Sequence, residues 1–411
     1  MAGIEAERGV VVVGAGQAGY QVADSLRREG FDGPVALVGE EPHLPYQRPP
    51  LSKSYMLGDL ARERLSFRNE DYYGKHNIAL RLGTRVTAIE RSSRQVRLVD
   101  GTTLPYSHLV LATGARVRRL PVPGADLAGV FDLRSLDDSD RIKAALARAA
   151  DVVVIGAGFI GLEFAAAAAK LGKRVRVLEA LPRVMARVLS PELSDFFTAL
   201  HRGHGVDIAC GMAVNAITGE SGAVSAVACA DGSSHKAELV LVGIGVVPET
   251  ALAEAAGLTI DNGIVVDGHG RTSDPAILAA GDCAAVEHPF TGRRIRLESV
   301  QNAADLGRTV AATIAGHDRP YVTVPWFWSD QYDVKLQMVG LQDGCDRTVL
   351  RGDPALGKFS LFHFRGTELR AIDSVNRAGD HLQGRKLLAA GVSPTPDQAA
   401  DPDFPLKSLL A

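Results

Sequence analysis

Two glycine-rich turns are the segments of this sequence whose spacing most directly indicates chemistry. Both VVVVGAGQAG and VVVIGAGFIG place the pattern G-x-G-x-x-G after a run of β-branched residues. One glycine permits a tight turn, one lets a pyrophosphate approach the backbone, and one lets the next helix pack against the sheet. The phosphates then lie at the helix N-terminus, where free N–H groups favour negative charge. The predicted phosphate-binding glycines are Gly14, Gly16 and Gly19 in the first turn and Gly156, Gly158 and Gly161 in the second.

An acidic residue follows the second strand of each unit at the distance that a ribose requires. Glu40 follows the strand 35–38, and Glu179 ends the strand after the second turn. A carboxylate there accepts both ribose hydroxyls and repels a 2′-phosphate, so Glu179 predicts a preference for NADH over NADPH. Arg183 lies close enough in sequence to weaken that preference. A plain βαβ unit with a glycine turn is the alternative, but strand, helix and acid together favour a dinucleotide.

Other strand ends supply further candidate contacts, because ligands of open α/β sheets bind at the carboxyl ends of the strands. A buried strand over 109–113 ends in Ala112, Thr113 and Gly114, although a simple loop glycine would give the same pattern. ILAAGDC places Asp282 after a strand, where it can bind a hydroxyl of a ribityl chain. LVLVGIGVV places Gly245 where a cofactor would lie close to the backbone.

The proline-rich loop LPYQRPPLSK carries two cations, Arg48 and Lys53. A cation beside the N5 edge of a flavin would stabilise the reduced, anionic ring. A solvent-facing basic loop explains the spacing equally well. Glu163, placed by the pattern in the first turn of the second helix, has two interpretations: an acid that complements the helix dipole, which sequence physics favours, or a partner of Lys53 beside a nicotinamide.

Composition and cysteines narrow the functional classes. The chain has 411 residues and a net charge of −3, which gives no reason to expect nucleic acid or an anionic membrane as a partner. Its first residues lack the pattern of a signal peptide, and its longest apolar run is far too short for a membrane span, so the expected compartment is the cytoplasm. No cysteine precedes Cys210, which argues against a dithiol or peroxide-reducing flavoenzyme. We interpret His201 and His204 as surface histidines and predict no metal site.

Two complete dinucleotide units in one chain predict an α/β fold with two Rossmann-like domains, one for FAD and one for NAD. Because the Asp282 segment returns to the first unit after the second, the FAD-binding domain is predicted to be discontinuous, over 1–118 and 248–325. The NAD-binding domain then covers 119–247. From residue 326 the composition changes, and WFW with alternating runs predicts a small C-terminal α+β domain over 326–411.

Seven segments, in this order, resemble the FAD-dependent ferredoxin reductases, the putidaredoxin reductase-like family with the glutathione-reductase-type fold. They are VVVGAGQAG, LPYQRPPLSK, LATGA, VVVIGAGFIGLE, ILAAGDCA, ESVQNA and PWFWSDQYDVKLQMVG. The resemblance implies FAD contacts at Ala18, Glu40, Lys53, Val86, Arg134, Asp282 and Val300. It also implies a Lys53–Glu163 pair beside the flavin and the nicotinamide. Ile160, on the helix after the second glycine-rich turn, is a further predicted NAD contact.

The implied activity is a ferredoxin reductase. NADH gives a hydride to FAD, and the electrons leave singly to a [2Fe–2S] ferredoxin that serves a haem-thiolate monooxygenase or a ring-hydroxylating dioxygenase. The surface facing the acceptor would include Arg308 and Trp328, and Arg293, Arg294 and Arg296 are further candidates for a positive docking face. Two alternatives remain: a related flavoenzyme that reduces a small oxidant such as oxygen or a quinone, and a flavoprotein that acts as a redox sensor and interaction partner.

Overall fold

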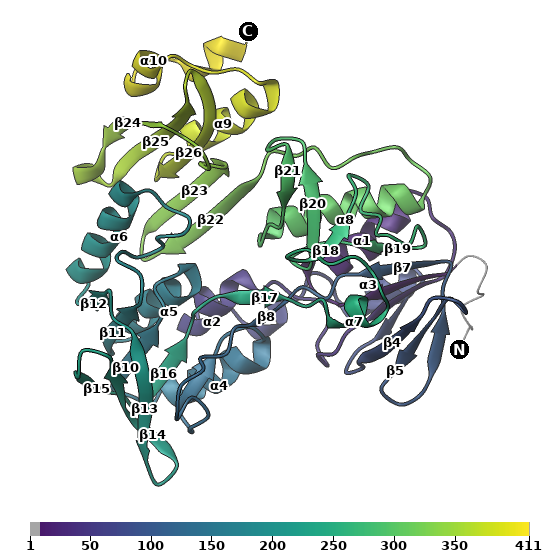
Figure 1. Cartoon of the computed structure of the whole chain (residues 1–411), viewed down its shortest axis with the longest axis horizontal. Helices are drawn as coiled ribbons and strands as arrows, with labels where there is room; N and C mark the ends of the chain where they lie inside the picture. Colours follow the sequence, from purple (N-terminus) through teal and green to yellow (C-terminus); the bar gives the residue numbers. More distant parts are fainter. Residues whose placement is uncertain (1–8, 411) are drawn as a thin grey trace.

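A five-stranded parallel sheet forms around the first glycine-rich segment in the computed structural model, which describes residues 9–410 (Figure 1). Its central strand consists of four valines that are all buried, as expected for a parallel strand covered on both faces. Val10 pairs with Val35 on one side and with His108 on the other. The strand order is β19 (Ile277–Ala279), β7 (His108–Leu111), β1 (Val10–Val13), β2 (Val35–Val38), β3 (Ile78–Arg81).

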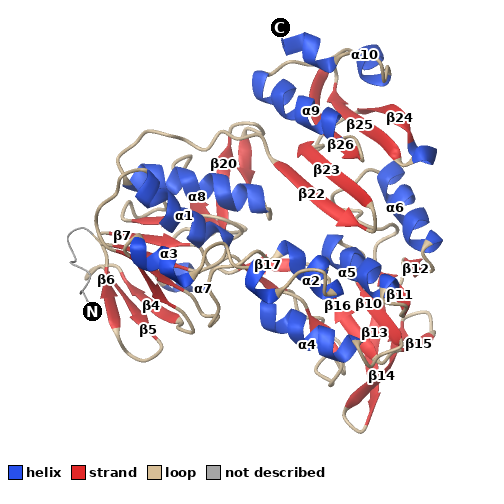
Figure 2. Cartoon of the chain, turned by 180° about the vertical axis from the view of Figure 1, so that it is seen from behind, coloured by secondary structure: helices blue, strands red, loops and turns tan. Residues whose placement is uncertain are grey.

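Helices α1 (Gln17–Arg28) and α8 (Val300–Ile314) pack against each other beside this sheet (Figure 2). Their close approach favours a glycine, since a Cβ on Gly307 would lie 3.1 Å from the Cβ of Gln21, a tight contact. Two small sheets and five short helices complete this part of the molecule. They are β4 (Val86–Glu90), β5 (Gln95–Leu98), β6 (Thr103–Pro105), β18 (Ile264–Val266), β20 (Ala284–His288), β21 (Arg293–Ile295), the 3₁₀ helices Pro49–Ser52 and Arg62–Arg64, α2 (Ser54–Leu57), α3 (Glu70–Lys75) and α7 (Ala251–Ala255).

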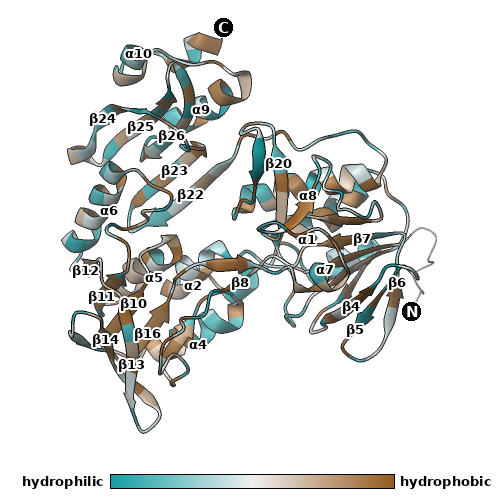
Figure 3. Cartoon of the chain, viewed as in Figure 1, coloured by the Kyte–Doolittle hydropathy of each residue, from teal (hydrophilic) through white to brown (hydrophobic). Residues whose placement is uncertain are grey.

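A second five-stranded parallel sheet surrounds the second glycine-rich segment, and hydrophobic residues dominate its central strands (Figure 3). Two short strands, β8 (Ala115–Val117) and β17 (Val246–Pro248), pair antiparallel where the chain passes between the two large sheets. The order of the second sheet is β12 (Asp207–Cys210), β11 (Arg174–Glu179), β10 (Asp151–Ile155), β16 (Leu239–Val242), β9 (Val130–Asp132), and its other elements are α4 (Leu136–Leu146), α5 (Phe159–Lys170), α6 (Pro191–Gly203), β13 (Val214–Glu220), β14 (Ala223–Cys229) and β15 (Ser234–Lys236).

The C-terminal part is an antiparallel sheet covered by helices. Its strand β25 is buried along nearly its whole length rather than on one face, because helix α6 packs on the other side through a Phe196–Phe359 ring contact with centroids 5.1 Å apart. The order is β22 (Trp326–Gln331), β23 (Val334–Gly340), β26 (Glu368–Val375), β25 (Lys358–Arg365), β24 (Arg347–Asp353), followed by α9 (Ala378–Ala390) and α10 (Pro396–Ala400), with 3₁₀ helices at Pro354–Leu356 and Leu406–Leu410.

The architecture confirms the predicted fold class: two Rossmann-like α/β units and a small C-terminal α+β unit. The two outermost limits of the predicted domains, at residues 1 and 411, lie outside the described residues. No helix within residues 9–410 has the length and apolar character needed to cross a membrane. Nor do the described His, Cys, Asp and Glu side chains form a group of three or more that could hold a metal ion.

Three local predictions were wrong. The strand of the LATGA segment ends at Leu111 rather than at residue 113. Glu163 is the fifth residue of α5, beyond the first turn, so it does not complement the helix dipole there. His201 is fully buried rather than on the surface, because the C-terminal sheet covers its face of α6.

Candidate functional site

A cavity of about 910 Å³ extends from the first glycine-rich turn to the start of helix α5 in the second unit. It therefore draws its walls from both parallel-sheet units and from the C-terminal strand β22. Of the residues predicted from sequence, those that line it are Gly14, Gly16, Ala18, Glu40, Arg48, Lys53, Val86, Ala112, Thr113, Gly114, Arg134, Ile160, Glu163, Asp282, Val300 and Trp328.

The first glycine-rich turn has the shape that a diphosphate needs. Gly14 has φ +108°, and a Cβ there would lie 2.1 Å from the carbonyl oxygen of Ala112. A Cβ on Gly19 would lie 1.8 Å from the oxygen of Gly14, so only glycine lets α1 begin so close to the strand. Over Gly16, by contrast, a Cβ would meet nothing within 4 Å, which leaves room for a phosphate at the helix N-terminus.

The second turn repeats this geometry outside the large cavity. Gly156 has φ +100°, and a Cβ on Gly161 would lie 2.2 Å from its oxygen, while the space over Gly158 is open. The Glu179 carboxylate accepts hydrogen bonds from the backbone N–H of Ala157 at 2.6 Å and of Leu181 at 2.9 Å. The acid thus lies directly at the turn, where a ribose bound over the glycines would meet it.

Gly245 and Arg183 were both expected near the NAD site, and their surroundings differ. Gly245 has φ +103°, and a Cβ there would lie 3.2 Å from Nη2 of Arg187, an arginine that sequence reasoning missed. The Arg183 guanidinium instead donates to the carbonyl oxygens of Ala186 and Leu189 and to Ser194. These hydrogen bonds direct the guanidinium toward the loop and the start of α6 rather than toward a 2′-phosphate.

Lys53 and Glu163, which are far apart in sequence, form an ion pair with Lys53 Nζ 2.6 Å from Glu163 Oε2. The Glu163 side chain is only 3% exposed and that of Lys53 18%. Ser52 Oγ also donates to Glu163 Oε2 at 2.6 Å, and Ser329 Oγ donates to Oε1 at 2.7 Å. Because Glu163 itself belongs to the second unit, its carboxylate links all three parts of the fold. Nothing in the sequence pattern singled out the two serines.

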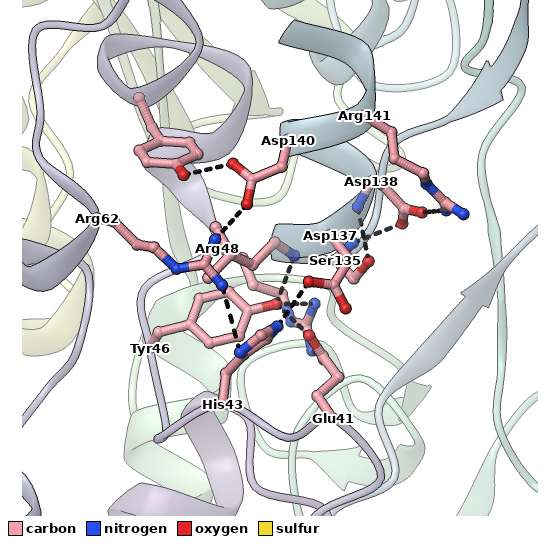
Figure 4. Close-up of polar contacts among 12 residues, drawn as sticks. Glu41, His43, Tyr46, Arg48, Arg62, Ser135, Asp137, Asp138, Asp140 and Arg141 are labelled. Atoms are coloured by element: carbon pink, nitrogen blue, oxygen red, sulfur yellow. Dashed lines mark hydrogen bonds and ion pairs between the residues drawn. The ribbon is translucent and has the colours of Figure 1, made fainter. Parts of the chain in front are cut away.

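Arg48 does not extend into solvent, because hydrogen bonds to other residues hold its guanidinium group in place. Its Nη2 lies 2.5 Å from Glu41 Oε1, and its Nη1 donates to the carbonyl oxygen of Arg134 at 2.6 Å (Figure 4). The Tyr46 hydroxyl donates to the same Glu41 and accepts from the backbone N–H of Leu136, the first residue of α4. Burial raises the pKa of Tyr46, so the hydroxyl keeps its proton.

The residues on either side of the proline-rich loop also bind helix α4 (Figure 4). His43 Nε2 lies 2.7 Å from Asp137 Oδ1, and both Arg62 and the Tyr55 hydroxyl bind Asp140. The segment that contains the loop is therefore held against the other α/β unit.

Asp282 faces the cavity opposite Arg134, whose Nη2 lies 3.3 Å from Asp282 Oδ2. Burial raises the pKa of the Asp282 carboxyl, and the Arg134 charge opposes that rise. Val300, at the start of α8, and Val86, at the start of β4, line the same cavity. Such a long cavity, with open glycines at one end and paired charges along it, fits an extended dinucleotide such as FAD.

The aromatic and basic side chains that were predicted to face the acceptor lie in different places. Trp328 lines the large cavity, and Phe327 packs on Phe159 of α5 with ring centroids 4.7 Å apart. Arg308 lies away from the cavity on α8, about half exposed, and pairs with Asp305. Arg293, Arg294 and Arg296 likewise each pair with a carboxylate, so these cations are partly neutralised within the chain.

Comparisons with known proteins agree with this geometry. The sequence profile of the pyridine nucleotide-disulphide oxidoreductases matches residues 8–307, and the reductase C-terminal profile matches residues 326–410. Rhodocoxin reductase of Rhodococcus erythropolis is 49% identical over 402 residues, covering 98% of this chain and 94% of the relative.

Two solved structures superpose over almost the entire chain. The ferredoxin reductase for the CYP199A2 system from Rhodopseudomonas palustris has a TM-score of 0.96 at 48% identity and covers 98% of this chain and 100% of its own. Putidaredoxin reductase in its covalent complex with putidaredoxin also has a TM-score of 0.96, at 43% identity, with 99% of each chain covered. This chain therefore belongs to the pyridine nucleotide-disulphide oxidoreductase family, among its putidaredoxin reductase-like ferredoxin reductases.

Proposed function

We propose that this protein holds FAD and passes electrons from NADH to a [2Fe–2S] ferredoxin that serves a haem-thiolate monooxygenase or a ring-hydroxylating dioxygenase. The observation that carries the proposal is the single cavity that joins the first glycine-rich turn to helix α5 of the second unit, with the Lys53–Glu163 pair at the junction. The names of rhodocoxin reductase and of the CYP199A2-system reductase support the same activity.

The proposed FAD site is formed by Gly14, Gly16, Ala18, Gly19, Glu40, Arg48, Lys53, Val86, Ala112, Thr113, Gly114, Arg134, Asp282 and Val300. Gly16 and the N-terminus of α1 would hold the pyrophosphate, Glu40 the adenosine ribose, and Asp282 a ribityl hydroxyl. Bound there, FAD supplies a hydride acceptor that can return electrons singly. The chain contributes an ammonium at Lys53, which Glu163 holds in place, and Arg48, which Glu41 and Tyr46 hold in place.

NADH would bind over the second glycine-rich turn. Gly156, Gly158 and Gly161 approach its pyrophosphate, Glu179 accepts ribose hydroxyls, and Ile160 and Gly245 line its path toward the flavin. Ile160 is exposed on the cavity wall, as contact with a nicotinamide requires. Because hydride transfer needs the two rings in contact, the task of these residues is to orient the rings and to exclude water.

The domain limits follow from the same assignment. We propose an FAD-binding domain over 1–118 and 248–325, an NAD-binding domain over 119–247 and a C-terminal domain over 326–411. The paired strands β8 and β17 support the first two limits, since the chain crosses between the two sheets at these strands. For the acceptor side we propose Arg308 and Trp328.

Cys283, which directly follows the cavity-lining Asp282, does not have the environment of a reactive thiol. Cys283 is fully buried and its Sγ donates toward the carbonyl oxygens of Leu111 and Ala280. Burial raises the pKa of this thiol, which keeps it protonated and unreactive. We place the protein in the cytoplasm, where NADH is available.

The experiment is spectroscopic. The purified protein should be yellow and release FAD, not FMN, on heat denaturation, and NADH should bleach the flavin under anaerobic conditions. Cytochrome c reduction should then depend on added [2Fe–2S] ferredoxin. A colourless protein, or reduction of cytochrome c at the same rate without ferredoxin, would contradict the proposal.

A further inference from the structure

A chain of hydrogen bonds runs from Tyr332 to the Glu163 carboxylate through three buried side chains. Ser329 Oγ lies 2.7 Å from Glu163 Oε1, and Gln331 Nε2 lies 3.2 Å from Ser329 Oγ. Gln331 Oε1 in turn lies 2.8 Å from His201 Nε2, and the Tyr332 hydroxyl lies 3.2 Å from His201 Nδ1. We call Tyr332, His201, Gln331 and Ser329 the donor chain.

One arrangement of hydrogens satisfies every link of the donor chain. An ionised Glu163 only accepts, so Ser329 donates to it and must itself accept from the Gln331 amide. Gln331 Oε1 then accepts from His201, which must carry its proton on Nε2. The free Nδ1 accepts from the Tyr332 hydroxyl. Each member therefore donates toward Glu163, and the assignment follows from the network as a whole.

This arrangement requires an uncharged His201, and the burial of the histidine favours that form. His201, Gln331 and Ser329 are each at most 1% exposed. Burial lowers the pKa of His201 to about 4, with His204 adding to the effect and Gln331 opposing it. Burial also raises the pKa of Tyr332, which keeps its hydroxyl protonated.

Charged and titratable side chains contact the donor chain or its target Glu163 at the two ends, and Asp330 stands between Ser329 and Gln331 on strand β22. Lys53 binds Glu163 at one end. At the other end the His204 ring stacks on Tyr332 with centroids 3.7 Å apart, and Lys170 Nζ donates to the Tyr332 carbonyl oxygen at 3.2 Å. The side chains of Gln331 and Ser329, in the middle of the donor chain, carry no ionisable group.

The donor chain stabilises charge rather than conducting protons. In its ordinary tautomer a glutamine amide cannot accept a proton on one side and release it on the other. Hydrogen bonds to the ionised form of a carboxylate favour that form, and successive donors polarise one another in a buried site. The chain therefore acts on Glu163, and through Glu163 on the Lys53 ammonium.

We propose that Ser329, Gln331 and His201 are positioning residues that hold the Glu163 carboxylate directed at Lys53, so that the C-terminal sheet sets the charge beside the flavin. This inference depends on the proposed function, since the pair has its role only when FAD and NADH meet there. Strand β22 suits this task because its alternate residues Trp328 and Asp330 line a second cavity of about 240 Å³, which Lys53 also lines.

The test compares FAD-loaded variants with Asp195→Asn, a change at an exposed residue of the same helix, as the matched control. Gln331→Met keeps volume but breaks the chain, His201→Phe removes its donor, and His201→Gln keeps a donor. Stopped-flow reduction of the flavin by NADH gives the pH at which the rate falls to half on the acid side, and spectroelectrochemistry gives the flavin midpoint potential.

We expect Gln331→Met and His201→Phe to move the acid-side half-point upward by about half a pH unit or more, a change of about threefold in proton affinity. The midpoint potential should shift with it, and His201→Gln should restore both toward wild type. Wild-type profiles and potentials in folded, FAD-loaded Gln331→Met and His201→Phe would overturn the inference. If His201→Phe does not fold, Gln331→Met decides the question.

A readout without flavin separates this inference from the proposed function. In FAD-free protein labelled with ¹⁵N-histidine, His201 should give the signal of a neutral ring protonated at Nε2, identified by its loss in His201→Gln. A ring protonated at Nδ1 or a charged ring at pH 7 would overturn the donor chain. Absence of NADH-dependent flavin reduction in wild type would instead overturn the proposed function.

Discussion

The Lys53–Glu163 pair should show a strong energetic coupling that a surface pair in the same chain does not. We consider the single variants Lys53→Met and Glu163→Gln and their combination. The structure places the two charges 2.6 Å apart, with the glutamate side chain 3% and the lysine side chain 18% exposed. Removing one partner of a buried pair costs about 3–5 kcal/mol, and residual access of water to Lys53 favours the lower end.

The coupling should be smaller than the cost of either change alone. Ser52 and Ser329 continue to bind the carboxylate after Lys53→Met, so part of its stabilisation survives. The coupling then reports the Lys53–Glu163 contact alone. A hydrogen bond to a charged group contributes about 1.5–3 kcal/mol, so we expect a coupling of about 2 kcal/mol.

The assay is a double-mutant cycle on the free energy of unfolding in urea, with FAD saturating throughout. The control cycle uses Arg365 and Glu368, which lie 3.2 Å apart on the surface and are each more than half exposed. Its coupling should lie below about 0.5 kcal/mol, as for exposed pairs in general. If the Lys53–Glu163 cycle gives a coupling as small as the control, the pair is not formed as the structure shows and the reasoning fails.

Three further changes test other parts of the site. Glu179→Ala should reduce the preference for NADH over NADPH, measured as the ratio of the two kcat/KM values, by the equivalent of about 1–3 kcal/mol. An unchanged ratio would mean that another residue binds the ribose. Arg308→Glu should raise the KM for ferredoxin and flatten its dependence on salt, while ferricyanide reduction stays near wild type; a parallel fall would place Arg308 in support of the fold. His201 has a folded pKa of about 4, below its ordinary value of 6.5, so the stability it contributes is present above pH 6.5 and lost as pH falls toward 4. This loss should reach about 2 kcal/mol at pH 5 in urea unfolding and be absent in His201→Gln.

The fold was largely predictable because its signals are local. A valine run, three glycines at fixed spacing and an acid at the next strand end all lie within one βαβ unit, and the unit occurs twice. The steric need for Gly14 and Gly19 is a property of the turn itself, so sequence spacing was sufficient to predict it.

The site was less predictable because its decisive contacts join residues far apart in the chain. From sequence physics alone, Glu163 was better explained as a dipole-complementing acid, and only the fold brings Ser52, Lys53 and Ser329 to it. His201 was taken for a surface residue because nothing on its own helix shows that the C-terminal sheet covers it. Arg48 could not be placed without Glu41 and Tyr46, whose side chains determine its position.

Electron stoichiometry under anaerobic conditions tests the central claim most directly. The FAD-loaded protein is mixed with a limiting amount of NADH and an excess of oxidised [2Fe–2S] ferredoxin, and the absorbance of both cofactors is followed. We predict that NADH first bleaches the flavin and that the flavin then reoxidises as two ferredoxins are reduced for each NADH consumed. Consumption of NADH with the ferredoxin still oxidised, or ferredoxin reduction without any change in the flavin, would contradict the account.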